Sequence, residues 1–186
     1  MSDAGYKIRN KEGIHFITFA VVKWVDVFTR KRYVDIFLDS LRHCQKEKGL
    51  LIHSWCLMSN HFHMIASTKE IKPNLSDNIR DLKKFTSTSI IESIKDEAEV
   101  ESRRGWMLWL FKSAGNKNPN NVNYQFWRQD NHPEEIFTKD FMESKLDYIH
   151  NNPVSAGLVE NAEDYFLSSA RDYLTNKKGL LEIDFV

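Results

Sequence analysis

The spacing of apolar and polar positions divides this chain into strands and helices in mixed order. Residues 15–25 are densely apolar and rich in β-branched and aromatic side chains, which predicts a central strand. Residues 50–57 predict a second strand, and the apolar stretch that ends at Ile65 predicts a third. Between them, Met58-Ser59-Asn60 is typical of a turn in which Asn60 tolerates a left-handed backbone. The sequence therefore predicts a rigid hairpin.

Helical spacing follows the first strand. Apolar residues recur at i, i+3, i+4 and i+7 between Val34 and Leu41. Thr29 is placed to cap this helix, and Gly49 is placed to end it after Lys48. The other predicted elements are a helix opened by Pro73 and Ser76, a solvated charged connection over 95–104, a helix that Gly115 ends, a loop over 116–123, and strands over 124–128 and 180–186.

The last long helical stretch brings a tyrosine and an amide to one face. Within residues 138–152, Tyr148 and Asn152 are spaced i and i+4, so they lie one turn apart and about 40° apart around the axis. Pro153 disfavours helical geometry for the residue before it, which predicts that the helix ends at Asn152. We therefore expect the amide at a helix terminus.

Composition indicates a single domain over residues 1–186. An apolar content of 41% in 186 residues can bury one sizeable core, and no low-complexity segment divides the chain. Lys and Arg number 26, as do Asp and Glu, so the net charge of zero provides no global field to attract nucleic acid. Any basic surface must be local, and the second predicted helix offers one patch with Arg80, Lys83 and Lys84.

The cysteines and the N-terminus indicate in which cellular compartment the protein is expected. Cys44 falls in a predicted helix and Cys56 in a predicted strand, which argues against a disulfide framework or a four-thiolate zinc site. The N-terminus is polar, and no apolar run approaches the roughly 18 residues of a spanning helix. We expect a cytoplasmic protein without a signal peptide, a membrane segment or a membrane partner.

Two histidines occupy the third predicted strand. Successive side chains on a strand point to opposite faces, so His61 and His63 share one face about 6 to 7 Å apart, while Phe62 and Met64 point the other way. Two imidazoles in this arrangement can hold one metal ion.

Each of these features alone favours a structural role. A His-x-His pair on a strand often occurs by chance, and a single tyrosine such as Tyr148 is most often a partly buried aromatic with a satisfied hydroxyl. The aromatics of residues 124–128 can stack on bases, but a strand over a sheet buries one face, so at least one of Phe126 and Trp127 is expected in the core. The histidine pair, the helical Tyr148 and Asn152, and the segment that follows them occur together, and this combination favours a functional role over a structural one.

Four segments carry a resemblance to a known family. They are 55–65 (Trp-Cys-Leu-Met-Ser-Asn-His-Phe-His-Met-Ile), 82–86 (Leu-Lys-Lys-Phe-Thr), Phe126-Trp127, and 147–159 (Asp-Tyr-Ile-His-Asn-Asn-Pro-Val-Ser-Ala-Gly-Leu-Val). With them the sequence resembles the single-tyrosine transposases that carry a His-hydrophobic-His motif, especially the repeat-associated tyrosine transposases.

The resemblance implies an α+β fold, a ferredoxin-like antiparallel sheet with packed helices. It implies that His61, His63 and Asn152 hold Mg²⁺ or Mn²⁺ and that Tyr148 attacks a DNA phosphodiester to form a 5′-phosphotyrosine. The implied partner is single-stranded DNA with a hairpin, bound by a monomer or a homodimer. The residues available to contact it are Arg80, Lys83, Lys84 and Arg128 for phosphates, and Trp127 or Tyr124 for stacking.

Two other function classes stay open. One is a domesticated DNA-binding module of the same fold that has lost turnover, against which the four intact site residues argue. The other is a small metal-dependent hydrolase or cupin-like enzyme built on the two histidines. A cupin would need a carboxylate four or five positions after His63, where Ser67 and Thr68 stand instead. The acidic run Glu97, Glu99 and Glu101 has no assigned role.

Overall fold

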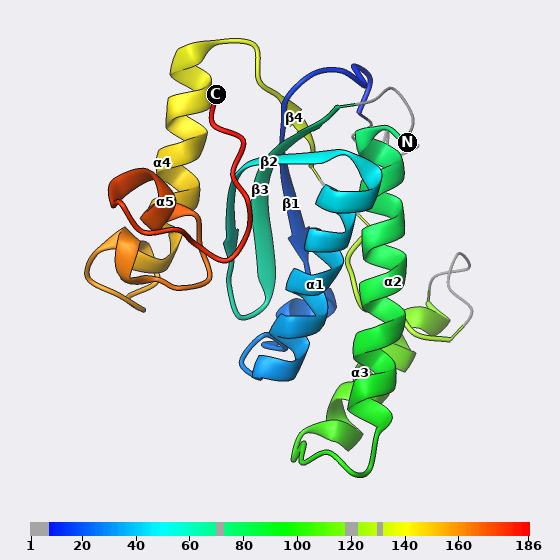
Figure 1. Cartoon of the computed structure of the whole chain (residues 1–186). Helices are drawn as coiled ribbons and strands as arrows, with labels where there is room; N and C mark the ends of the chain where they lie inside the picture. The colour runs from blue at the N-terminus through cyan, green and yellow to red at the C-terminus, as the bar shows by residue number, and fades with distance from the viewer. Residues whose placement is uncertain (1–7, 70–72, 118–122, 130–131) are drawn as a thin grey trace.

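A computed structural model describes residues 8–69, 73–117, 123–129 and 132–186. Its centre is a four-stranded antiparallel sheet in the order β2-β3-β1-β4 (Figure 1). The α+β prediction of a ferredoxin-like antiparallel sheet with packed helices is confirmed. The strands are β1 (His15–Ala20), β2 (Leu50–Leu57), β3 (His61–Thr68) and β4 (Glu134–Glu135).

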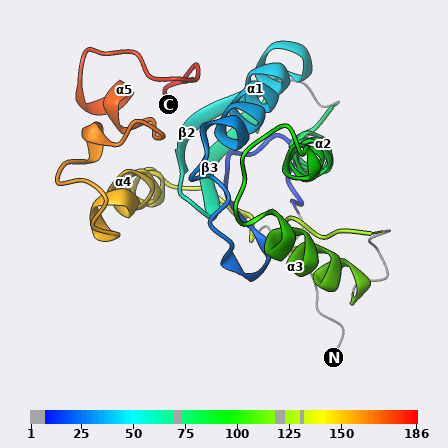
Figure 2. The same cartoon turned by 90° about the horizontal axis from the view of Figure 1, so that it is seen from below.

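The helices cover both faces of the sheet. Figure 2 shows strands β2 and β3 between α4 on one side and α1 and α2 on the other. The helices are α1 (Lys31–Lys48), α2 (Leu75–Lys95), α3 (Arg104–Asn116), α4 (Lys139–Ser155) and α5 (Ala170–Leu174), with 3-10 turns η1 (Val22–Trp24) and η2 (Ala162–Asp164). None of the described helices is both long and apolar enough to cross a membrane.

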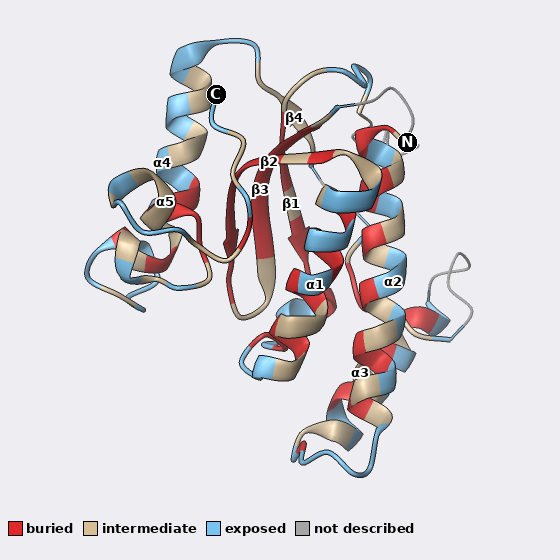
Figure 3. Ribbon diagram, in the orientation of Figure 1, coloured by how far each residue is buried: buried red, intermediate tan, exposed pale blue. Residues whose placement is uncertain are grey.

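Alternation along the central strands creates two cores, and the strands are buried almost throughout (Figure 3). On β3, Phe62 and Met64 belong to the larger core, which includes residues of α1, α2 and α3. Ile65 belongs instead to the smaller core, which includes Phe16 of β1 and Ile149 of α4. Because His61 and His63 have the same parity as Ile65, they face α4. This confirms that the two histidines share a face opposite Phe62 and Met64.

Two caps differ from the prediction. Thr29 does not cap α1, because its hydroxyl donates to the Asp26 carbonyl and the N-cap position is Arg30. Gly49 does end α1, with φ 63° and its N–H bonded to the Cys44 carbonyl. Helix α2 begins at Leu75, two residues after Pro73, because the Asn74 side chain and Asp77 form a capping box.

Other local predictions were wrong in their backbone geometry. Asn60 is not left-handed, since the non-glycine residues with positive φ in the described part of the chain are Lys23, Trp24 and His132. Helix α4 does not end at Asn152 but continues to Ser155 with Pro153 inside it. Pro153 is buried in this last turn, and its packing outweighs both the one backbone hydrogen bond that a proline cannot donate and the preference of the residue before proline.

The predicted strands after α3 and at the C-terminus are irregular. Residues 124–128 form only an isolated bridge between Val21 and Trp127. Residues 180–186 form no strand, although the Asp184 N–H bonds the Ile52 carbonyl on the edge strand β2. Gly115 does not end α3, which continues to Asn116. The absence of a side chain at Gly115 instead lets the backbone of Asn123 approach the helix closely. Of the predicted loop 116–123, residues 118–122 lie outside the described residues.

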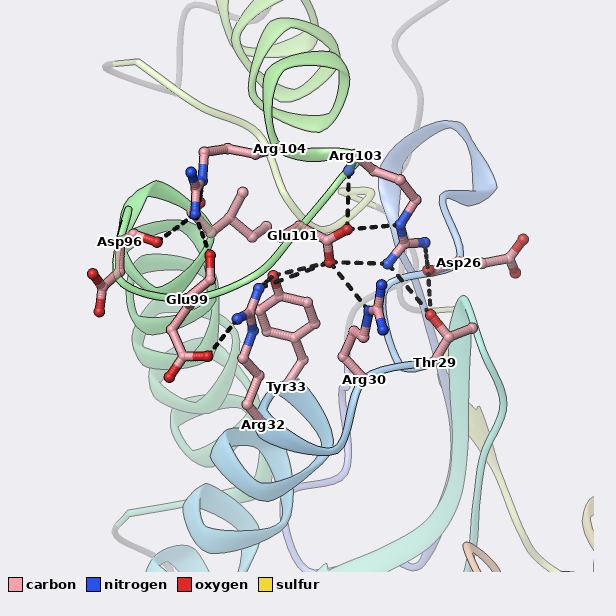
Figure 4. A network of polar contacts seen from close by, with 11 residues as sticks. Asp26, Thr29, Arg30, Arg32, Tyr33, Asp96, Glu99, Glu101, Arg103 and Arg104 are labelled. Carbon is pink, nitrogen blue, oxygen red and sulfur yellow. Dashed lines mark hydrogen bonds and ion pairs between the residues drawn. The ribbon is translucent and has the colours of Figure 1, made fainter.

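The connection between α2 and α3 is not uniformly solvated, which corrects the prediction for 95–104. The side chain of Glu101 is 0% exposed and accepts hydrogen bonds from Arg103 at 3.0 Å and Tyr33 at 3.3 Å (Figure 4). Arg30 and Arg32 lie 3.7 and 3.8 Å away. Burial raises the pKa of Glu101, but the hydrogen bonds and charge of Arg103, with Arg30, outweigh it and lower the pKa to about 2.

Candidate active site

The β2–β3 hairpin presents two histidine rings side by side. His63 is 4% exposed, whereas His61 is partly exposed at the start of β3. The ring centroids lie 4.8 Å apart with the planes at 78°, closer than strand spacing alone predicts because the rings lean together. Both rings therefore border one small region between β3 and α4.

Hydrogen bonds fix the orientation of both rings. Nδ1 of His61 lies 2.7 Å from Oδ1 of Asn60, the residue before it in the turn. Nδ1 of His63 lies 2.8 Å from the hydroxyl of Thr18, its antiparallel partner on β1. Because both Nδ1 atoms are engaged in hydrogen bonds, Nε2 is the ring nitrogen of each histidine that could bind a metal ion. Such partners are what hold metal-binding histidines in place.

The environment of Asn60 determines the tautomer of His61. Nδ2 of Asn60 lies 2.9 Å from the carboxylate of Asp26 and 3.4 Å from the carbonyl of Trp24, both of which only accept hydrogen bonds. The amide nitrogen therefore faces these groups and the amide oxygen faces the imidazole. Nδ1 of His61 must then carry the proton and donate it, which leaves a lone pair on Nε2.

Helix α4 brings the predicted tyrosine and amide to the histidines. The ring of Tyr148 is edge-on to His63 at 5.2 Å and to Phe16 at 5.9 Å between centroids. Nδ2 of Asn152 lies 3.5 Å from Nε2 of His63. His61, His63, Tyr148 and Asn152 thus lie together, although they come from positions far apart in the sequence.

Tyr148 differs from the other tyrosines on this side of the sheet. Its side chain is 51% exposed, and among the described residues its hydroxyl has no hydrogen-bond partner. In contrast, Tyr165 donates to the Leu57 carbonyl and Tyr173 to the His53 carbonyl, and burial raises the pKa of both phenols to about 12. Tyr148 is therefore the tyrosine with a hydroxyl available to a ligand at the histidine pair.

The imidazoles are suited to binding a metal ion. Burial lowers the pKa of His61, although a hydrogen bond to Asn152 opposes this. Burial, with the charges of His61 and Lys145, lowers the pKa of His63 to about 3. Both rings are neutral at neutral pH, which is the form that binds metals. The described residues contain no group of three His, Cys, Asp or Glu side chains that could hold a metal, and the polar side chain beside Nε2 of His63 is the amide of Asn152.

A buried polar cluster holds α4 in register with the sheet. His150, two residues after Tyr148, contacts the hydroxyls of Ser54 on β2 and Ser169 through Nε2 at 3.1 and 2.9 Å. Burial lowers the pKa of His150 to about 4, so the ring is neutral. Ile149 packs between these residues and the sheet core. The rotation of α4 that aims Tyr148 and Asn152 at the histidines is fixed by these contacts.

Most of the predicted DNA contacts line one groove. Lys83, Lys84, Trp127 and Arg128 border it, together with Tyr124. Nζ of Lys83 donates to the Arg128 carbonyl, which links α2 to the segment beside β1.

Two of the predicted contacts fit less well. Arg80 is absent from the groove and pairs with the carboxylates of Asp77 and Asp81. Trp127 is 5% exposed, and its indole N–H donates to Thr86. The expectation that Trp127 stacks on a base is therefore wrong, and its interpretation as a core residue is confirmed.

Sequence reasoning missed the residues that support the site. Thr18 and Asp26 act through contacts that depend on strand register and loop packing, for which a single sequence carries no signal. Asn60 stood next to the His-x-His motif but was interpreted only as a turn residue. Lys145 lies one turn before Tyr148, and that helical spacing was a usable signal. Trp24 lies in the apolar run 15–25, which predicts a strand and gives no sign that the indole is exposed.

On one face of the sheet, the histidine pair of β3 thus lies against a tyrosine and an amide of the facing helix α4. A family model described as IS200-like transposase matches residues 13–124, more than half of the chain, so the chain belongs to the IS200-like transposase family. The matched range includes both histidines but ends before Tyr148 and Asn152. No curated protein sequence matches the chain.

The fold is also similar to a solved structure described as "Structure of the REP associates tyrosine transposase bound to a REP hairpin". The TM-score is 0.66 with 18% sequence identity, over 100% of this chain and 94% of that chain. At this identity the likeness concerns the fold, and it extends over α4, which the family match does not reach.

Proposed function

We propose that this transposase-family chain cleaves and rejoins single-stranded DNA with Tyr148 as the nucleophile. The observation that carries the proposal is the exposed Tyr148 ring packed against His63, with Asn152 of the same helix 3.5 Å from Nε2 of that histidine. A phenol with a pKa near 10 is a weak nucleophile at neutral pH, so it needs help from its surroundings. The residues around Tyr148 are those that would give this help.

The proposed ligands of a divalent ion, Mg²⁺ or Mn²⁺, are Nε2 of His61, Nε2 of His63 and the amide oxygen of Asn152. In this structure Nδ2 of Asn152 lies beside Nε2 of His63, so the amide would have to rotate for its oxygen to reach an ion held by both imidazoles. Two imidazoles alone would suit zinc or manganese, whereas an amide oxygen and a phosphate suit Mg²⁺ or Mn²⁺, which we favour. When bound, the ion neutralises charge on the scissile phosphate.

The chain's own residues carry out the rest. The Tyr148 oxygen attacks the phosphorus, a new phosphotyrosine bond forms to the 5′ phosphate of the downstream strand, and the bond to the 3′ oxygen breaks. The phenol proton leaves to solvent, and the departing oxygen takes up a proton to become a 3′-hydroxyl. Because one phosphodiester replaces another, the reverse attack by a 3′-hydroxyl rejoins DNA without ATP.

We propose a hairpin with single-stranded flanks as the partner. The similar solved protein is described as bound to a REP hairpin. In this chain the groove with Lys83, Lys84 and Arg128 offers a few cations for phosphates. The net charge of zero does not favour binding along an extended duplex. The chain would act as a monomer or a homodimer.

A covalent adduct tests the proposal. Oligonucleotides that carry a hairpin and single-stranded flanks are incubated with the full chain and Mg²⁺ or Mn²⁺, then analysed under denaturing conditions. We expect a protein-linked band that retains a label at the 3′ end but not one at the 5′ end, and that a chelator abolishes. A DNA-binding module without turnover would shift the native band and form no adduct. A linked band that carries the 5′ label would contradict the proposed polarity.

A further inference from the structure

Trp24 is an exposed aromatic held in a strained turn beside the histidine pair. The indole is 50% exposed, at the end of the 3-10 turn that follows β1. Lys23 and Trp24 have φ angles of 56° and 54°, in the left-handed region that non-glycine residues rarely adopt. Strained backbone of this kind is found at functional sites more often than elsewhere.

The surroundings hold this turn in place. Val21 donates its N–H to the Asn60 carbonyl, and Val22 donates to the Phe126 carbonyl. The carbonyl of Trp24 accepts from the amide of Asn60, the same amide that orients His61. The turn is therefore connected to the site by hydrogen bonds, while its largest side chain stays in solvent. Burial of the indole does not explain this conformation.

Two aromatic rings bracket the histidine pair. Trp24 is edge-on to His61, with 5.7 Å between centroids and 78° between planes. Tyr148 is edge-on to His63 at 5.2 Å and 75° on the other side. A nucleotide strand that places a phosphate at Tyr148 and crosses the histidines therefore reaches Trp24 within one or two nucleotides.

The charge around Trp24 suits a nucleic acid. The guanidinium carbon of Arg128 lies 5.6 Å from the centre of the indole ring, and Lys23 is exposed next to it in the sequence. Arg128 also borders the groove that contains Lys83 and Lys84. Arg128 therefore lies both at this groove and beside the indole, and the indole in turn contacts His61. An aromatic face flanked by cations is the surface that single-stranded nucleic acids use for base stacking.

We propose that Trp24 is a stacking platform for an unpaired base one or two nucleotides from the scissile phosphate, with Arg128 on the adjoining backbone. The inference rests on the proposed function. It gives to Trp24 the stacking role that the buried Trp127 cannot fill. Stacking tolerates any base, so this platform positions the strand rather than reading its sequence.

Fluorescent oligonucleotides test the platform independently of cleavage. The probe is a short hairpin with thymidine flanks that carries 2-aminopurine at one flank position at a time, because stacking quenches 2-aminopurine. It is titrated with the Tyr148→Phe protein, which cannot form the adduct. We expect quenching at one flank position. Adding Trp24→Ala should remove this quenching and weaken binding about 5- to 150-fold, whereas Trp24→Phe should keep most of the quenching and most of the affinity.

Two further variants control for folding and for general aromatic exposure. Trp24→Asn removes the ring but tolerates the left-handed backbone, so it should lose stacking without loss of thermal stability. Trp109→Ala removes an indole that is 67% exposed on α3, and it should bind and quench like the parent. The platform would be overturned if quenching persisted in Trp24→Ala and Trp24→Asn. It would also be overturned if Trp109→Ala lost as much quenching as the Trp24 variants.

The two proposals fail in different ways. An adduct with wild-type protein combined with Trp24-independent quenching would refute the platform alone. Trp24-dependent quenching without any adduct would refute the proposed catalysis and leave the platform standing.

Discussion

Oδ1 of Asn60 accepts a hydrogen bond from Nδ1 of His61 at 2.7 Å, and the same amide donates to Asp26 at 2.9 Å. This pair of contacts connects the turn of the hairpin to the loop before α1. These contacts place the proton of His61 on Nδ1. Nε2 therefore keeps its lone pair on the side of the ring that faces α4.

Asn60→Ala should therefore weaken metal binding, while the adduct yield at saturating Mn²⁺ stays nearly the same. Loss of such a supporting contact typically costs about 10- to 100-fold in metal affinity. The adduct yield is measured against Mn²⁺ concentration, and the midpoint is expected to rise by that factor. Asn161→Ala serves as the control, because that side chain is exposed and, among the described residues, bonds only Asp164. An unchanged midpoint in Asn60→Ala would show that His61 is oriented by other contacts.

The three proposed metal ligands should differ in their importance. His61→Ala and His63→Ala are each expected to abolish adduct formation, because each removes one of two imidazole ligands. Asn152→Ala should reduce the rate less, since water can replace a neutral amide oxygen. Rates are compared at saturating Mn²⁺ with fold checked by circular dichroism. Full activity of the chelator-treated wild type would rule out the metal role.

The buried Glu101 should make stability depend on acid pH. Its pKa is lowered to about 2, so ionised Glu101 stabilises the fold above its unfolded value of about 4.5, and this contribution is lost as pH falls from there toward 2. Glu101→Gln should lower the free energy of unfolding at pH 7 by about 3 kcal/mol, because it leaves arginines without their buried partner.

Urea unfolding at pH 7, 4 and 3 measures this effect. The difference between wild type and Glu101→Gln is expected to shrink as the pH falls. Glu97→Gln is the matched control, since Glu97 is exposed in the same connection. A constant difference across the three pH values would mean that Glu101 stabilises the chain through packing and not through its charge.

Substrate form provides a further prediction. An oligonucleotide with a hairpin and single-stranded flanks should be bound and nicked, while the same sequence as a perfect duplex should not. The scissile phosphate has to bend into a site between β3 and α4, and a flexible single strand does this at low energetic cost. Gel shift and cleavage of the two forms at equal salt decide the matter. Equal cleavage of the duplex would refute this prediction.

The four residues of the candidate site could be predicted from the sequence because their positions obey local rules. Strand alternation is enough to place His61 and His63 on one face, and helical spacing is enough to align Tyr148 with Asn152. What no local rule supplied was the packing of α4 against β3. That contact depends on the buried cluster of His150, Ser54 and Ser169, which joins distant segments of the chain.

The errors in the prediction have a common physical origin. Pro153 stays helical, and Trp127 is buried with its N–H on Thr86, because tertiary packing outweighs local preference at both positions. The strained turn at Trp24 lies within what looked like a continuous strand of apolar residues. Its geometry is imposed by hydrogen bonds from Val21, Val22 and Asn60, all of which reach across the fold.

The proposal that Tyr148 is the nucleophile is tested most directly by locating the residue to which the DNA is linked. The adduct is digested with trypsin and nuclease, and the peptide that carries the residual nucleotide is sequenced by mass spectrometry. The expected tryptic peptide, residues 146–171, contains both Tyr148 and Tyr165, so fragmentation must assign the modified residue. We expect the nucleotide on Tyr148 and no adduct from Tyr148→Phe, which should retain its fold and nearly its full DNA affinity. An adduct that forms normally in Tyr148→Phe, or a nucleotide found on another residue, would contradict the proposal.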